Sequence, residues 1–238
     1  MRKEFLLKKL LLILCVAALL PNAQATAGEG AFGAGGFFDF YIPLFNFKDM
    51  YDSGTKFGGT AHYIYHKRKM VEVEFHHARF NDGSLETRTF SFSDGKEYTS
   101  PQAEANMTIN SIHANWLFAL REQGFGQGTT TYLTFGAGLH DYASKVSGLI
   151  FAGQTPSGAG APPDPNILLE PVNDTRTAFS ASFGGGVQIG LGDKAALDVR
   201  ARYNIVMGEL RPFLIWGIEK TYPFNLIDIG AGIKFNLN

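Results

Sequence analysis

The sequence lacks cysteine outside its first segment, because the single cysteine of the 238-residue chain is Cys15. This residue lies in an apolar run from Leu10 to Leu20, which follows several basic residues and precedes the small-x-small sequence Ala23-Gln24-Ala25. Such a pattern is typical of a secretory signal peptide, so we expect residues 1–25 to be cleaved on export. The mature chain would then hold no cysteine, and disulfides cannot stabilise it.

Long hydrophobic runs are also missing after residue 25, where none approaches the roughly 20 residues that a transmembrane helix needs. A basic excess is missing too, since removal of residues 1–25 leaves 17 basic and 21 acidic residues, a formal charge of −4. This balance excludes the strongly basic surface of a nucleic-acid-binding protein. A mature chain embedded in a membrane must therefore be a closed β-barrel, because only helices and closed barrels satisfy every backbone group in hydrocarbon.

What the sequence does contain is strict alternation of apolar and polar residues, clearest in the stretch from Thr177 to Met207. A period of two over this length predicts two long strands, and Gly192-Asp193-Lys194 supplies a tight turn between them. Centring the turn on Asp193 predicts three polar cross-strand pairs: Gly186 with Arg200, Gly184 with Arg202, and Gln188 with Asp198. The small residues opposite the arginines would leave room for the guanidinium groups across an enclosed space.

The same alternation predicts six further strands, at 31–42, 56–66, 70–80, 107–120, 129–141 and 227–238. The connections after the second, fourth and sixth strands are short, whereas those after the first, third, fifth and seventh are long, which is typical of an outer-membrane barrel. Pro43 is expected to end the first strand, and 142–176 is expected to be the longest loop. The stretch from Leu85 to Phe92 is interpreted as a hairpin extension beyond the membrane rather than a ninth spanning strand.

The sequence therefore predicts an all-β fold, a closed eight-stranded antiparallel transmembrane up-and-down β-barrel that spans residues 26–238. A soluble, lipocalin-like barrel with its apolar face inward is the alternative. The polar face is largely glycine and serine in several strands, where a solvated surface would carry more charge, so lipid contact on the apolar face is favoured. Charged residues make up 18% of the chain, which suits a wall with one lipid-facing side.

Two segments, FSASFGGGVQIGLGDKAALDVRARY and the final DIGAGIKFNL, resemble the small OmpA/OmpX-like outer-membrane β-barrel proteins. The resemblance implies an outer-membrane location, and the last strand resembles the signal that the barrel assembly machinery reads. The residues that would carry this assembly signal are Gly230, Gly232, Ile233, Phe235 and Leu237. The sequence departs from a terminal phenylalanine, because Asn238 follows Leu237. The family is functionally mixed, so the resemblance implies location and fold more than activity.

Charged and histidine side chains on the inward faces are the candidate functional residues. The predicted lumen network consists of His62, Glu72, Glu74, His76, Asp198, Arg200, Arg202 and Lys234, with Asp39, His113, His140 and Asp228 as further inward candidates. Salt bridges are expected to satisfy them, because an unpaired buried charge is costly. A turn centred on Arg68 predicts that His62 faces Glu74 and that Thr60 faces His76.

Four inward histidines on consecutive strands, His62, His76, His113 and His140, raise the possibility of a metal site. None of them has the short fixed spacing of a specific metal motif, so the sequence predicts no metal and no cofactor. An enzyme that acts on lipid A would need serine, histidine and an acidic partner on the lipid-facing surface. His77 is the only strand histidine predicted to point outward, so the sequence favours a protein without catalytic activity.

The function that these patterns favour is a monomeric outer-membrane scaffold with four extracellular loops and a salt-bridged polar lumen. Its expected partners are outer-membrane lipid and lipopolysaccharide and the barrel assembly machinery, with no nucleic acid. Two alternatives remain open: a narrow channel or small-solute transporter, and a lipid-A-modifying enzyme.

Overall fold

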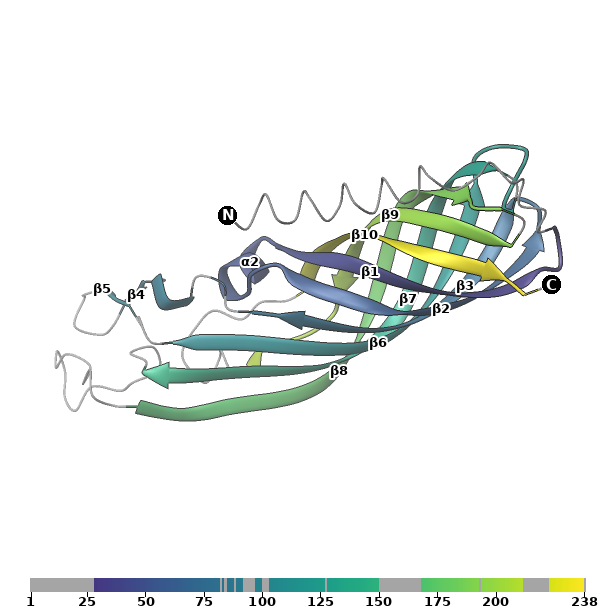
Figure 1. The fold of residues 1–238 in the computed structure, drawn as a ribbon. Coiled ribbons are helices and arrows are strands. Elements are labelled where there is room, and N and C mark those ends of the chain that lie inside the picture. The colour runs from purple at the N-terminus through teal and green to yellow at the C-terminus, as the bar shows by residue number, and fades with distance from the viewer. Residues whose placement is uncertain are drawn as a thin grey trace.

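The protein forms a closed β-barrel in a computed structural model that describes residues 28–81, 83, 85–87, 89–91, 97–99, 103–126, 128–149, 168–192, 194–211 and 223–237 (Figure 1). The barrel strands are β1 (Phe32–Leu44), β2 (Gly54–His66), β3 (Lys69–Phe80), β6 (Glu104–Ala119), β7 (Thr129–Leu149), β8 (Leu168–Gly190), β9 (Ala195–Val206) and β10 (Phe224–Asn236). They close in the order β1-β10-β9-β8-β7-β6-β3-β2, and every neighbouring pair is antiparallel. The predicted eight-stranded up-and-down barrel is confirmed.

The apolar face of each strand points outward, as the alternation predicted for a lipid-facing barrel. Phe75, Phe135 and Phe179 are 57%, 53% and 73% exposed, and they belong to a belt of large apolar side chains around the whole wall. Burying a side chain of this size is worth about 1.5–3 kcal/mol, so such a belt is stable only against lipid. The alternative of a lipocalin-like barrel with an apolar interior is wrong. No helix among the described residues is long and apolar enough to cross a membrane.

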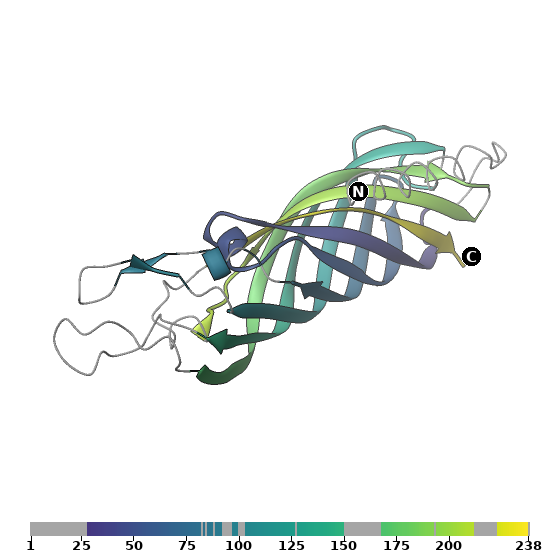
Figure 2. The same cartoon turned by 60° about the vertical axis from the view of Figure 1, so that its left-hand side comes forward.

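The two ends of the barrel differ. The helix α2 (Asn46–Met50) and the small hairpin of β4 (Phe90–Ser91) and β5 (Glu97–Tyr98) lie at the end opposite the C-terminus, and both views place them there (Figures 1 and 2). β4 pairs with β5 in a separate two-stranded sheet, and the 3-10 helix η1 (Leu85–Thr87) precedes it. The described part of 85–92 therefore adds no strand to the barrel, as predicted.

Several predicted strand boundaries are wrong. β1 does not stop at Pro43 but reaches Leu44, because beyond Tyr41 it pairs only with β10 and the proline leaves one ladder intact. The predicted loop 142–176 is too long, since β7 continues to Leu149 and β8 begins at Leu168. The two strands keep their backbone ladder beyond the apolar belt, because nothing in a hydrogen-bond ladder requires lipid on its outer side.

The register of one hairpin was predicted and that of another was not. All three pairs predicted for the β8–β9 hairpin are present: Gly186 with Arg200, Gly184 with Arg202, and Gln188 with Asp198. In the β2–β3 hairpin, however, His62 pairs with Glu72 and Thr60 pairs with Glu74, so the prediction was displaced by two residues. The register shifts between Ile64 and His66, and this irregularity moves the turn centre away from Arg68.

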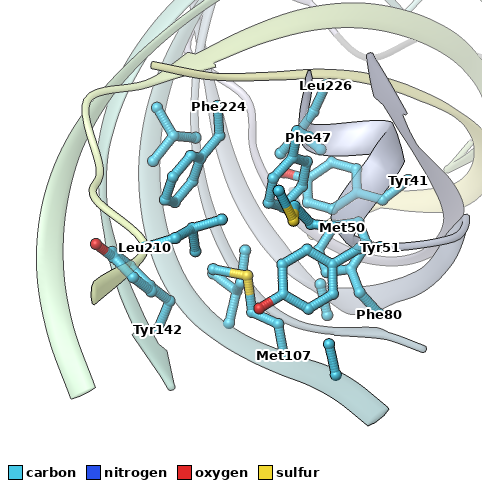
Figure 3. Packing of buried hydrophobic residues seen from close by; sticks show 14 of the residues in the cluster. Tyr41, Phe47, Met50, Tyr51, Phe80, Met107, Tyr142, Leu210, Phe224 and Leu226 are labelled. Atoms are coloured by element: carbon cyan, nitrogen blue, oxygen red, sulfur yellow. The ribbon is translucent and has the colours of Figure 1, made fainter. Parts of the chain in front are cut away.

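The interior is divided into layers, which the inward residues of β3 show in order. Met70 belongs to an inner apolar cluster near the short turns, Glu72, Glu74 and His76 form a polar middle, and Phe80 belongs to an outer apolar cluster. Figure 3 shows that Phe47 and Met50 of α2 pack inside the outer cluster. The inner cluster comprises Ala31, Ile64, Met70, Leu117, Ala119, Phe125 and Tyr132.

Candidate functional site: a charged layer inside the barrel

Nine charged side chains lie buried in the middle of the barrel, and we call them the charged layer. They are Asp39, Lys56, Glu72, Glu74, Asp198, Arg200, Arg202, Asp228 and Lys234, contributed by β1, β2, β3, β9 and β10. Strand alternation places them there, because each occupies an inward position of its strand. The layer holds five carboxylates against four cations, a formal charge of −1.

Arg202 is the most connected cation of the charged layer. Its Nη1 lies 2.9 Å from Glu74 Oε2, and its Nη2 and Nε donate to the two carboxylate oxygens of Asp228 at 3.0 and 3.2 Å. Lys56 Nζ lies 2.8 Å from both Glu74 Oε1 and Asp228 Oδ2. Two carboxylates and two cations therefore form one four-membered ion-pair cluster across β2, β3, β9 and β10.

The rest of the layer continues this cluster toward the short turns. Arg200 lies 3.1 Å from Asp39 and 3.4 Å from Glu72, and its guanidinium sits 4.0 Å from the ring centroid of Phe37. Lys234 Nζ then lies 2.5 Å from Glu72 Oε2 and 3.2 Å from Asp198 Oδ2. The layer is thus a continuous network, since Glu72 bridges the two cations.

Glycines make room for the two arginines. A Cβ added at Gly184 would collide with the backbone carbonyl of Ala201 and with the side chain of Arg202. A Cβ at Gly186 would collide with the Tyr132 ring, whose hydroxyl donates to Asp198 Oδ1 at 2.8 Å. The small residues of β8 therefore allow long charged side chains from β9 to lie across the lumen.

Most residues of the predicted lumen network lie in this layer. The structure brings together Glu72, Glu74, Asp198, Arg200, Arg202 and Lys234, and His76 Nδ1 lies 2.8 Å from Glu74 Oε1. His62 is also buried, but its Nε2 contacts Asn236 Oδ1 at 3.1 Å. Sequence reasoning missed Lys56, although its even number on β2 puts it on the same face as Thr60 and His62.

The histidines separate into one distant residue and one group of three. His76, His113 and His140 lie on the adjacent strands β3, β6 and β7, with ring centroids 4.8–5.8 Å apart. His113 Nε2 and His140 Nε2 are 2.9 Å apart. The alternation predicted that these rings point inward, but their common height in the barrel depends on a register that the sequence left open.

Two rows of paired residues on the outer wall mark where the apolar belt ends. The row Phe75, Ile112, Leu139 and Phe179 is apolar and exposed, whereas the next row toward the loops is His77, Asn110, Asp141 and Thr177. His77 Nδ1 lies 2.8 Å from Asn110 Oδ1, and Thr177 Oγ1 donates to Asp141 Oδ1. This change within two residues indicates where the lipid-facing part of the wall ends on the loop side. β7 and β8 therefore extend well beyond the membrane.

The residues of the predicted assembly signal lie on β10, which closes the barrel against β1. Ile233 and Phe235 point outward and are 44% and 50% exposed, and Leu237 follows the strand with 69% exposure. Gly230 and Gly232 take inward positions, where a Cβ would collide with Asp39 and Phe37. Apolar residues on the outer face and glycines on the inner face are what the closing strand of this barrel requires.

A small cavity of about 10 Å³ lies at the turn end of the barrel, beside Lys234, His62 and Gln188. This is room for roughly one water molecule. The lumen at this end is therefore filled by side chains, not by a wide column of water.

Comparison with known proteins agrees with this architecture. Residues 10–235 match the family described as outer membrane protein beta-barrel domain. The chain belongs to this family. An outer-membrane location follows from the membership. The predicted signal peptide, residues 1–25, lies outside the described residues.

Several solved structures are similar to the chain. Neisserial surface protein A has 14% identity, with 88% of this chain and 100% of that chain covered and a TM-score of 0.48. The N-terminal β-barrel domain of OprF from Pseudomonas aeruginosa has 12% identity, 89% and 100% coverage and a TM-score of 0.43. Ail, the attachment invasion locus protein of Yersinia pestis, has 16% identity, 87% and 99% coverage and a TM-score of 0.43. A comparison with curated protein sequences found no match.

Proposed function

We propose that the chain is a non-conducting outer-membrane scaffold that presents its long connections at the cell surface. The observation that carries this proposal is the layered interior, in which the charged layer lies between two apolar clusters. An ion crossing the barrel would have to pass the outer cluster, where Phe47 stacks on Phe224 at a centroid distance of 5.0 Å. It would then have to separate ion pairs that are 2.5–3.4 Å long.

The helix α2 supports the same function, because it turns back into the barrel mouth. The chain enters it through Phe45, whose φ of 54° is rare outside glycine. Tyr51 Oη then lies 2.7 Å from Ser144 Oγ of β7, across the mouth. The segment of α2 is therefore fixed by apolar packing and by a hydrogen bond. It closes the lumen at the loop end of the barrel.

The outer wall supports presentation of the remaining connections. β7 and β8 continue past the row that contains Asp141 and Thr177, and their residues there pair as Lys145 with Asn173. Polar side chains on this extension suit the lipopolysaccharide head groups and the aqueous exterior. We propose that lipid and lipopolysaccharide surround the wall and that the barrel functions as a monomer.

We also propose that residues 1–25 direct export and that the barrel assembly machinery recognises β10. Residues Ile233, Phe235 and Leu237 support this role, since their apolar side chains line the outer face of the strand. No catalytic role is proposed. His77, the outward histidine, is hydrogen-bonded to the amide of Asn110 and so resembles part of a surface polar row.

A narrow water-filled path is the second candidate, and one observation favours it. Thr60 Oγ1, Ser182 Oγ and the side-chain amide of Asn115 are buried without a hydrogen-bond partner in the described part of the chain. Buried polar atoms of this kind commonly bind ordered water. A file of such waters beside the charged layer would connect with the cavity near Lys234.

Single-channel conductance in planar lipid bilayers separates the two candidates. The scaffold proposal expects silent bilayers for the folded wild-type barrel, because two apolar clusters and the charged layer close the lumen. The unboiled protein must first show the altered gel mobility of a folded barrel, so that silence is not mistaken for misfolding. Regular conductance steps from the wild type would overturn the proposal and establish the narrow channel. Unchanged lipid A in mass spectra of producing cells would agree with the absence of a catalytic role.

A further inference from the structure

Three histidines inside the barrel form a compact group with the arrangement of a metal-binding site. His76, His113 and His140 each offer a ring nitrogen, and these three atoms all lie within 4.8 Å of one another. The three residues come from adjacent strands, where His76 pairs with Ser111, Ser111 pairs with His140, and His113 lies two residues along β6. The wall thus places three ring nitrogens that could bind a metal on one side of the lumen.

The Nδ1 atoms of His76 and His140 lie close to polar side chains, and the Nε2 atoms of His113 and His140 face one another. His76 Nδ1 lies 2.8 Å from Glu74 Oε1, and His140 Nδ1 lies 2.5 Å from Ser111 Oγ. In metal sites, the second ring nitrogen of a ligating histidine usually bonds a carboxylate or another polar group in this way, which fixes the orientation of the ring. Ser111 therefore occupies the position of a supporting residue for His140, whereas Glu74 lies at ion-pair distance from His76 without hydrogen-bond geometry.

The protein satisfies the Nε2 atoms of the three rings only in part, and Ser180 Oγ lies 3.1 Å from His113 Nε2. His76 Nε2 is buried and has no hydrogen-bond partner among the described residues. His113 Nε2 and His140 Nε2 are 2.9 Å apart and can share only one proton in a hydrogen bond. The unpartnered Nε2 of His76, beside the facing nitrogens of His113 and His140, offers a lone pair that a bound metal ion would satisfy.

Size and charge agree with a metal ion. Histidine binds zinc at 2.0–2.1 Å, so tetrahedral ligand nitrogens lie about 3.3 Å apart, between the 2.9 Å and the 4.8 Å limit of this group. Small rotations of the rings would reach that geometry. The neighbouring charged layer carries one more carboxylate than cations, which favours an added positive charge. Gly138, which pairs with His113, leaves space for the ring of that histidine, because a Cβ there would collide with it.

We propose that His76, His113 and His140 bind a divalent transition-metal ion of the zinc class. Imidazole donors select zinc, nickel, cobalt or copper over magnesium and calcium. The ion would link β3, β6 and β7 from inside the barrel and leave a fourth position for water. Because the outer and inner apolar clusters cover the site from both ends, the ion would enter while the barrel folds. This inference departs from the sequence prediction of no metal, and it holds whether or not the barrel conducts.

Refolding with cobalt tests the proposal directly. Untagged protein is refolded from urea into detergent micelles with cobalt chloride or with EDTA, passed over a desalting column, and examined for bound cobalt and for visible d–d absorption. We expect equimolar cobalt, an absorption band that zinc abolishes, and a higher urea midpoint with zinc than with EDTA. A folded wild type that retains no cobalt would overturn the proposal.

Matched variants identify the ligands. His140→Gln is expected to abolish retention of cobalt, whereas His62→Gln, which alters a buried histidine outside the group, is expected to retain it. Should His140→Gln fail to show the gel mobility of a folded barrel, Ser111→Ala provides the second test. Loss of its hydrogen bond to His140 should weaken binding roughly tenfold to a hundredfold.

Surface binding gives a different pattern. His66 and His77 lie on the exposed side of the wall or near a turn. Loss of cobalt from the paired variant His66→Gln/His77→Gln, with full retention in His140→Gln, would identify an adventitious ion only and overturn the proposal.

Discussion

Replacing Arg202 with methionine tests whether the charged layer is a dry, packed network. The guanidinium contacts Glu74 and Asp228 at 2.9–3.2 Å and Asp39 at 3.8 Å, and Arg202 is 4% exposed. Removing one partner of a buried ion pair leaves uncompensated charge and typically costs about 3–5 kcal/mol. At about 1.4 kcal/mol per factor of ten, the folding equilibrium constant should fall roughly a hundredfold to a few thousandfold.

A water-filled lumen predicts a much smaller effect. Hydrated ion pairs contribute only about 0–1 kcal/mol, because water screens the charges and replaces the lost contacts. The assay is equilibrium urea unfolding of the refolded barrel in lipid vesicles, followed by the fluorescence of the lipid-facing Trp116 and by gel mobility. If Arg202→Met unfolded at the same urea concentration as the wild type, the packed network would be refuted.

Two further variants control for the loss of any arginine. Arg176→Met removes a pair with Asp174 that is 2.7 Å long but partly exposed on β8, and it should alter the urea midpoint far less than Arg202→Met. Combining Arg202→Met with Asp228→Leu should cost less than the sum of the single changes, by about 0.5–3 kcal/mol, because the two side chains are hydrogen-bonded to each other.

Two predictions concern the wall. Phe135→Arg should reduce the free energy of unfolding in vesicles by about 2–4 kcal/mol, because it puts a charge on the lipid-facing belt. Thr108→Arg lies beyond the polar row and should leave that free energy nearly unchanged. Equal effects of the two variants would contradict the proposed boundary. Gly186→Ala should prevent the gel-mobility shift of the folded barrel, since its Cβ would meet the carbonyl oxygen of Val199. Gly36→Ala, with its nearest contact at 3.7 Å, should fold normally.

Alternation predicted which face each side chain takes, because the period of two is a property of the strand itself. It placed Phe183 outward and Arg200 inward without reference to any other strand. The height of each side chain along the barrel axis depends on the strand register, which the turns determine. The β8–β9 turn is regular and its pairs were predicted, whereas the irregularity between Ile64 and His66 displaced Glu74 from His62 to Thr60.

The sequence predicted which residues form the candidate site, but it did not predict which of them are in contact. The inward positions of Glu72 and Arg202 follow from their strands, but their proximity depends on closure of β1 against β10, which strand patterns do not encode. Lys56 was missed because it lies at the expected start of β2, and the convergence of His76 with His140 required two registers in succession. β7 extends past its predicted end at Asp141 to Leu149, into a stretch where the outward residues are no longer apolar.

The closed ring also determines how freely the surface of this protein can change over evolution. Each barrel strand pairs with the strands that precede and follow it in the barrel sequence. Within the described part of the chain, the exception is the pair of β1 with β10, which joins segments far apart in the sequence and closes the barrel at a seam. The entropic penalty of closing such a seam grows only with the logarithm of the intervening length, about 0.6 kcal/mol for each doubling. Insertions at the β4–β5 hairpin would therefore hardly affect the fold, so this end of the molecule can diversify rapidly while the interior stays constant.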